Sequence, residues 1–250
     1  MGYGDEIIAT AEAKEAKKKF SKAKILIGDG RKIYPSLIYL NNPNIFQNSN
    51  LDSSKGDNIW ILNYINNRPY VDYLNSNSEK IFWDHKFSVK PGEIYLSNSE
   101  KKIGIETIKN ATKLWEDSFS KRSKFVVVIE PNVKSTNYKK ITGSSTIGYS
   151  NINRDWGFDK WQSVVNILKD RITFLQPHKG DVRKLSNVIH INCNFRGAIS
   201  ILNQSDMFLG THSGFSHAAA ALNKDAINIF GGWISPETVS YTHLTLPTKA

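Results

Sequence analysis

The residues best suited to chemistry lie in a small-residue turn near the end of the chain, Gly210–Gly214, and in the helix expected directly after it. The segment DMFLGTHSGFSHAAAALNKDAINIFGG at positions 206–232 predicts a strand, a turn, a helix and a second strand. Where a turn leads from a strand into a helix, unpaired backbone N–H groups and the helix dipole both favour phosphate. The segment therefore predicts an anion site, and a nucleotide diphosphate is the ligand it suggests.

Two histidines strengthen this interpretation, because a small-residue turn by itself also serves simply to pack a helix on a sheet. His212 lies in the turn and His217 lies early in the expected helix, so both side chains could point at a bound ligand. The alternative is structural, with His217 capping a loop and His212 solvated.

The bulk composition indicates a globular protein with an anionic partner. The chain has 250 residues, a net charge of +10 and one cysteine, which fits a reducing cytoplasm. The first ten residues do not form a signal peptide, and no apolar stretch approaches the ~20 residues that span a bilayer, so we expect a soluble protein. Nucleic acid, an acidic membrane surface or a phosphorylated substrate would each suit the charge. Nucleic acid is disfavoured because the aromatic residues do not interleave with the basic ones.

Much of the positive charge is concentrated on one early helix and its exit. The residues are Lys14, Lys17, Lys18, Lys19, Lys22 and Lys24. They form either an ordinary solvated helix face or a docking patch for anionic lipid headgroups.

The elements that must position the turn alternate between strand and helix. Helices are predicted from Gly2 to about Phe20 and over Ser99–Ser118, Trp156–Leu168, Gly197–Asn203 and Ser216–Leu222. Strands are predicted over Lys24–Ile27, Asn58–Tyr64, Glu93–Leu96, Phe125–Ile129, Ile172–Leu175, Val188–Ile191, Met207–Leu209 and Ala226–Phe230. This order predicts a doubly wound α/β domain over residues 125–230, preceded by a rougher version of the same plan. Lys121–Lys124 is the expected linker, and Glu130–Asp155 is expected to be a long polar loop.

Four motifs together resemble glycosyltransferase family 9, whose best-known members are the ADP-heptose–lipopolysaccharide heptosyltransferases. They are Gly4-Asp5, WGFDKW at Trp156–Trp161, Phe195-Arg196 and GTHSGFSHAAAA at Gly210–Ala221. The resemblance is close over residues 125–241 and looser over residues 1–110. It implies an α/β fold of the GT-B type, with two Rossmann-like domains and mainly parallel sheets. Residues 1–120 would be an incomplete acceptor-side domain, and residues 121–238 the nucleotide-sugar-binding domain.

The same resemblance implies an inverting sugar transfer in one displacement, with no metal and no other cofactor. Asp5 matches the family's carboxylate in the first glycine-rich loop, the proposed general base. A carboxylate is suited to that role because an acceptor hydroxyl must lose its proton as the new bond forms. The alternative is that Asp5 only caps the helix that follows it.

Further residues would bind the donor and its departing diphosphate. Arg154 stands where the family often has a lysine, and a guanidinium can bind two phosphate oxygens at once. Ser213 and Gly214 would offer backbone N–H groups and a hydroxyl, and His217 a further hydrogen-bond donor. Arg196 is a weaker candidate that could simply pair with an acidic neighbour. Arg154 could likewise be an ordinary exposed loop arginine.

The chain departs from the family pattern in three places. His212 stands where many heptosyltransferases have an aspartate that contacts the donor, so ADP-heptose is only one candidate donor. The chain begins at the glycine loop, without the strand that normally precedes it. Residues 239–250, VSYTHLTLPTKA, resemble translated sequencing-adapter read-through. These last two departures predict a fragment with an artefactual tail.

The function expected from the sequence is therefore transfer of a sugar from a nucleotide sugar to a bacterial cell-envelope saccharide or glycolipid, such as lipopolysaccharide core. The expected location is the cytoplasm, with peripheral contact at the inner face of the cytoplasmic membrane. Alternatives are another nucleotide-sugar enzyme such as an epimerase, a nucleotide-binding module without catalysis, and nucleic-acid binding through charge alone.

Overall fold

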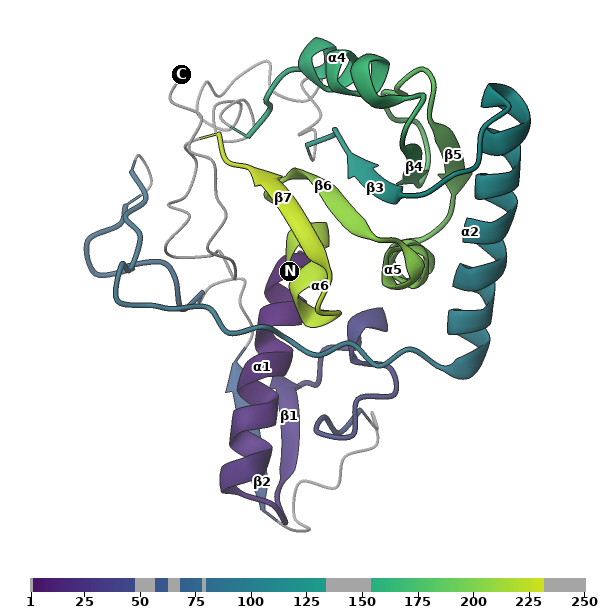
Figure 1. The fold of residues 1–250 in the computed structure, drawn as a ribbon. Coiled ribbons are helices and arrows are strands. Elements are labelled where there is room, and N and C mark those ends of the chain that lie inside the picture. Colours follow the sequence, from purple (N-terminus) through teal and green to yellow (C-terminus); the bar gives the residue numbers. More distant parts are fainter. Residues whose placement is uncertain (1, 48–56, 63–67, 78–79, 134–153, 232–250) are drawn as a thin grey trace.

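The protein is built around two parallel sheets, one of two strands and one of five (Figure 1). The computed structural model describes residues 2–47, 57–62, 68–77, 80–133 and 154–231. The larger sheet has the strand order β5-β4-β3-β6-β7, and every pairing in it is parallel. The expected α/β architecture with mainly parallel sheets is confirmed.

The first unit contains α1 (Tyr3–Lys19), β1 (Lys24–Gly28), the short 3-10 helix η1 (Leu37–Tyr39) and β2 (Asn58–Leu62). The N-terminal half of the helix is buried nearly all round, from Ile7 to Ala11, and Ile7 and Ala13 share a core with Ile25 and Ile27 of β1. Acidic residues in its first turn and lysines in its last turn both complement the helix dipole. These features fix α1 on the small sheet, with its N-terminus directed toward the second unit (Figure 1).

The second unit is a sheet covered on both faces. Its elements are β3 (Val126–Glu130), α4 (Phe158–Leu168), β4 (Thr173–His178), β5 (Ile189–Asn192), α5 (Phe195–Gln204), β6 (Met207–Thr211), α6 (Gly214–Ala221) and β7 (Asp225–Ile229). In β3, Val127 and Ile129 pack with Trp161 of α4, whereas Val126 and Val128 join the core on the opposite face. The continuous apolar run of β3 follows from this double coverage, because both faces of a central parallel strand are buried.

The long helix α2 (Asn98–Phe119) packs along α5 of the second unit (Figure 1). The two helices cross closely at Gly104, where a Cβ would lie 2.3 Å from the carbonyl oxygen of Ser200. The expected boundary between the two domains, at residues 120 and 121, stays a prediction. Helix α2 precedes this boundary in the sequence but packs against the second unit.

Most expected elements are present within a few residues of their predicted ends, and one prediction is wrong. Glu93–Leu96 is not a strand. The backbone N–H of Glu93 donates to Thr10 Oγ1 of α1, and a Cβ on Gly92 would lie 2.2 Å from the Ile7 carbonyl oxygen. The segment is extended because it packs under α1, and its apolar residues serve that contact instead of a sheet.

Several sequence predictions fall outside the described residues. They concern the end of the strand expected over Asn58–Tyr64, most of the polar segment Glu130–Asp155, and the tail at 239–250. Across the described ranges, no helix combines the length and apolar character needed to cross a membrane.

Candidate active site

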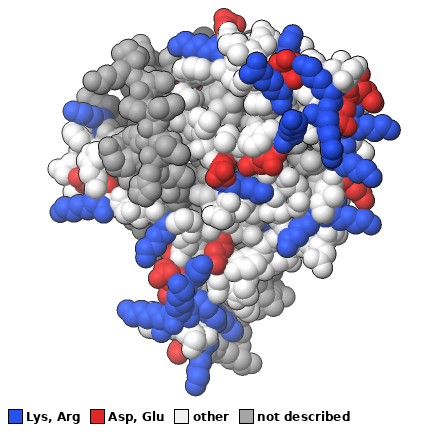
Figure 2. Space-filling model, viewed as in Figure 1, with Lys and Arg blue, Asp and Glu red and all other residues white. Residues whose placement is uncertain are grey.

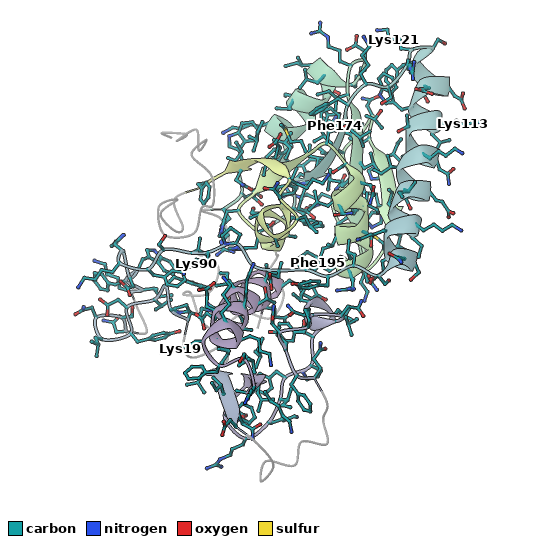
Figure 3. The ribbon with its side chains drawn as sticks, turned by 60° about the horizontal axis from the view of Figure 1, so that its bottom comes forward. Lys19, Lys90, Lys113, Lys121, Phe174 and Phe195 are labelled. Carbon is teal, nitrogen blue, oxygen red and sulfur yellow. The ribbon has the colours of Figure 1, made fainter. Side chains whose placement is uncertain are left out.

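The two units meet where the first turns of α1 and α6 come together. A Cβ on Gly4 would lie 2.8 Å from Cδ2 of His217, and a Cβ on Gly214 would lie 3.4 Å from the Gly4 nitrogen. Beside this contact the Tyr3 ring stacks on Phe195, with centroids 4.2 Å apart, and Phe195 lies between the two units in Figure 3. Glycines allow this close approach, because a Cβ at Gly4 would force the buried His217 ring to shift. The positive ends of two helix dipoles are thereby brought to one place.

Ser213 and Gly214 form the start of α6, as the sequence predicted. Ser213 is the N-cap: its Oγ accepts from the Phe215 N–H at 3.2 Å, and its own N–H donates to Ser216 Oγ at 3.1 Å. Ser216 in turn donates to Asn228 on β7 at 2.6 Å. The turn that was expected to bind an anion is therefore held rigidly at the carboxyl end of the sheet, where α/β folds bind ligands.

Asp5 lies on the first turn of α1 and is only 7% exposed. Asp5 is not the N-cap considered from the sequence, because Gly2 holds that position; from the third residue of α1 its Oδ2 lies 3.5 Å from the Gly2 nitrogen, as in a capping box. Two further groups hold the carboxylate: the Tyr70 hydroxyl donates to Oδ1, and Arg68 Nε lies 3.4 Å from Oδ2. Sequence reasoning missed both partners, which come from a loop about 65 residues further along the chain.

Arg154 lies in this cluster and is not an exposed loop arginine. Burial lowers the pKa of its guanidinium, and Tyr70, Arg68 and Asp5 are the titratable groups that act on it. The next residue, Asp155, pairs with Arg183 at 3.0 Å and accepts from the Gly157 N–H at 2.9 Å. These contacts fix the turn that presents Arg154 to the junction of the two units.

His212 and His217 are brought together, with ring centroids 5.2 Å apart. Burial, and then the Arg154 charge, lower the pKa of His217 to about 4. Burial also lowers the pKa of His212 strongly, so both rings are neutral at pH 7. Among the described residues neither ring nitrogen of His212 has a hydrogen-bond partner, although both are buried. A neutral imidazole in that state can offer a ligand one donor and one acceptor. The reading of His212 as a solvated histidine is thus not supported.

Arg196, a weaker candidate for donor binding, instead makes hydrogen bonds within the protein. Its guanidinium donates to both carboxylate oxygens of Glu100 and to the carbonyl oxygens of Leu37 and Tyr95. The residue is 4% exposed, and its hydrogen bonds lower the pKa of Glu100 to about 2. Arg196 therefore makes the pairing with an acidic neighbour that the sequence left open, and it joins α5 to the start of α2 and to η1.

Glu130 is a third residue that sequence reasoning missed. It ends the apolar strand β3, and its Oε1 accepts from the Asn132 N–H at 2.7 Å. Burial raises the pKa of this carboxyl group to about 7. The available signal was a carboxylate at the carboxyl end of a central parallel strand, a position at which ligands commonly bind.

Within the described ranges there is no group of three or more His, Cys, Asp or Glu residues placed to hold a metal ion. The charged and polar groups that converge at the junction are instead Asp5, Arg68, Tyr70 and Arg154, with the two histidines beside them. This arrangement can bind an anion and can accept a proton.

No protein-family model and no curated protein matches the sequence. A solved structure does match: the glycosyl transferase family 9 protein from Veillonella parvula, at 10% identity and a TM-score of 0.62, over 98% of this chain and 84% of that one. The chain has the fold of that glycosyl transferase. The expected GT-B-like architecture is thereby confirmed.

Two structures of the heptosyltransferase WaaC from E. coli, one with ADP and one with ADP-2-deoxy-2-fluoro heptose, match less of the chain. Their identities are 15% and 13%, and both TM-scores are 0.32. The matches cover 45% and 47% of this chain but only 35% and 36% of the WaaC chains, about a third of their length.

Proposed function

We propose that the protein is a glycosyltransferase that moves a sugar from a nucleoside-diphosphate donor to an acceptor hydroxyl, with inversion and without a metal. The observation that supports this most directly is that Asp5 lies near enough to Arg154 to act on its charge, at the junction of the two units and beside the start of α6. A proton acceptor and a diphosphate-binding group lie there together, in a chain with the fold of a family 9 glycosyl transferase.

In the proposed step the acceptor oxygen forms a bond to the anomeric carbon as the bond from that carbon to the diphosphate oxygen breaks. The electron pair of the broken bond leaves with the nucleoside diphosphate. The proton of the acceptor hydroxyl passes to Asp5, because an alcohol is a poor nucleophile until it loses that proton. A single displacement from the face opposite the leaving group inverts the anomeric centre.

The leaving diphosphate gathers negative charge, and the site offers fixed positive charge to receive it. Arg154 can donate two hydrogen bonds, and the start of α6 adds the Gly214 N–H and the positive end of the helix dipole. The neutral rings of His212 and His217 supply further hydrogen-bonding groups without opposing charge. Such preorganised groups stabilise the transition state, which supports a metal-independent reaction.

The acceptor proposed is an anionic saccharide or glycolipid of a bacterial cell envelope, such as lipopolysaccharide core, and ADP-heptose is one candidate donor. Both follow from the motif resemblance. Figure 2 shows Lys and Arg side chains gathered around the end of the molecule where α1 finishes. This lysine-rich end, which includes Lys17, Lys18 and Lys19, supports peripheral contact with anionic headgroups at the cytoplasmic face of the membrane.

A nucleotide-binding module without transfer is the second candidate. It is favoured by one observation: Asp5 already makes a capping contact and an ion pair with Arg68, as a purely structural carboxylate would. Both candidate functions require the nucleotide-binding site. Only the glycosyltransferase requires Asp5 for turnover.

Calorimetric titration of the chain with ADP, GDP and UDP tests the shared part of the proposal. We expect one of the three to bind, and Arg154→Ala to weaken that binding at least tenfold, because charge-assisted hydrogen bonds contribute about 1.5–3 kcal/mol. The matched control is Arg171→Ala, an exposed arginine just before β4, which should change the affinity less than twofold. No binding by the folded protein, or equal loss in both variants, would refute the donor site.

A further inference from the structure

The Tyr70 hydroxyl is placed against the carboxylate that the proposed reaction uses. It donates to Oδ1 of Asp5, which lies 65 residues earlier in the sequence and in another segment of the fold. Burial raises the pKa of the Tyr70 hydroxyl well above its usual value of 10.0, with Asp5 adding to the effect. The hydroxyl therefore stays protonated and keeps the proton that it donates to Asp5 across the working pH range.

Tyr70 is itself held in place by the loop that carries it. The Tyr70 carbonyl oxygen accepts from the Asp84 N–H at 3.0 Å, and the ring lies 6.2 Å from both Trp83 and Phe87. A bridge between Val71 and Trp83 closes the same loop. These contacts hold the Tyr70 ring in one orientation, so its hydroxyl donates to Asp5 in a fixed direction.

The two oxygens of Asp5 are not equivalent. Oδ1 is taken by the Tyr70 hydroxyl. Among the residues that the structure describes, the donors near Oδ2 are the Gly2 nitrogen at 3.5 Å and Arg68 Nε at 3.4 Å, both longer than the 2.7–3.2 Å of an ordinary N–H···O hydrogen bond. Oδ2 is accordingly the oxygen with capacity for another donor.

We propose that Tyr70 is a positioning residue that fixes Asp5 through Oδ1 so that Oδ2 receives the proton of the acceptor hydroxyl. This inference rests on the proposed function. The Gly2 contact at 3.5 Å and the Arg68 contact at 3.4 Å are both too long to fix rotation of the carboxylate by themselves. A misdirected base loses the short contact that proton transfer needs. Tyr70 acts through Asp5 and not on the substrate. Its loss should therefore lower turnover and leave donor binding in place.

The first test measures nucleoside-diphosphate release, with water as acceptor, from the nucleotide sugar whose nucleotide binds in the titration. Tyr70→Phe should lower kcat at least tenfold and change KM and the nucleotide Kd less than twofold. The same substitution should have no further effect in an Asp5→Asn background. Tyr34→Phe is the matched control, because the Tyr34 hydroxyl donates to Asp29 at 2.9 Å in a turn outside the site. An unchanged kcat, or an equal loss in both backgrounds, would overturn the proposal.

A second test does not need turnover. The test is a double-mutant cycle in which urea unfolding gives the folding equilibrium constant of each variant. Tyr70→Phe and Asp5→Asn should each lower this constant. The double variant should lower it at least fivefold less than the two single effects multiplied together. Independent effects would show that Tyr70 does not act on Asp5. A wild-type chain that binds nucleotide but releases none from any nucleotide sugar would refute the proposed transfer. The cycle would still decide whether Tyr70 holds Asp5.

Discussion

Replacing Glu100 by Gln should destabilise the protein in a way that depends on pH. Glu100 lies in the first turn of α2, where its Oε2 accepts from the backbone N–H of Ser97 at 2.7 Å. The same carboxylate pairs with Arg196 of α5, whose side chain is 5% exposed, whereas that of Glu100 is 24% exposed. Gln keeps the size and the capping contact but removes the charge. It leaves the Arg196 guanidinium buried without a counter-charge.

The magnitude follows from the pKa of Glu100, which the Arg196 hydrogen bonds lower from 4.5 to about 2. Because the folded pKa is depressed, the ionised carboxylate stabilises the fold above pH 4.5, and this contribution is lost as the pH falls toward 2. At 1.36 kcal/mol per pKa unit, the shift corresponds to an upper limit of about 3.4 kcal/mol at neutral pH, which solvent screening at the partly exposed Glu100 reduces. Removing one partner of a buried pair has a cost of similar size, roughly 3–5 kcal/mol.

The assay is urea unfolding of both proteins at pH 7, 5, 4 and 3, followed by the fluorescence of the six tryptophans. The gap in unfolding free energy should be nearly constant from pH 7 to 5 and should fall below half its value at pH 3. Glu106→Gln, an exposed position on the same helix, is the control and should show almost no gap. A gap that persists unchanged to pH 3, or no gap at pH 7, would refute the role assigned to this pair.

Two glycines at helix crossings give the remaining predictions. Gly4→Ala should weaken nucleotide binding measured by calorimetry, because its Cβ would lie 2.8 Å from His217 Cδ2 and would push α1 away from α6. The control is Gly2→Ala, which should bind nucleotide normally because its Cβ would lie 3.9 Å from the nearest atom. Gly104→Ala should lower the free energy of unfolding by at least about 1–3 kcal/mol, measured by thermal melting, because its Cβ would lie 2.3 Å from the Ser200 carbonyl oxygen. An unshifted melting temperature would contradict the close crossing of α2 and α5.

Local patterns in the sequence were sufficient for most of the larger sheet. The apolar run of β3 and the small-residue helix α6 are recognisable because their burial is dictated by neighbours that any doubly wound sheet supplies. The prediction of a strand over Glu93–Leu96 was wrong because local pattern does not show what an apolar segment packs against. An extended apolar segment has the same pattern whether it pairs with a strand or, as here, packs under a helix and bonds to Thr10.

The sequence by itself determined the alternation of strands and helices, the turn that starts α6, and the acidic residue that begins α1. These depend on hydrophobic periodicity and capping, which act over a few residues. Only the tertiary structure decided which groups meet. It placed Tyr70 and Arg68 on Asp5, buried Arg154 beside them, and turned Arg196 to Glu100, 96 residues away. A hydrogen bond between distant segments leaves no periodic trace in either, because it depends on the packing that brings the two segments together.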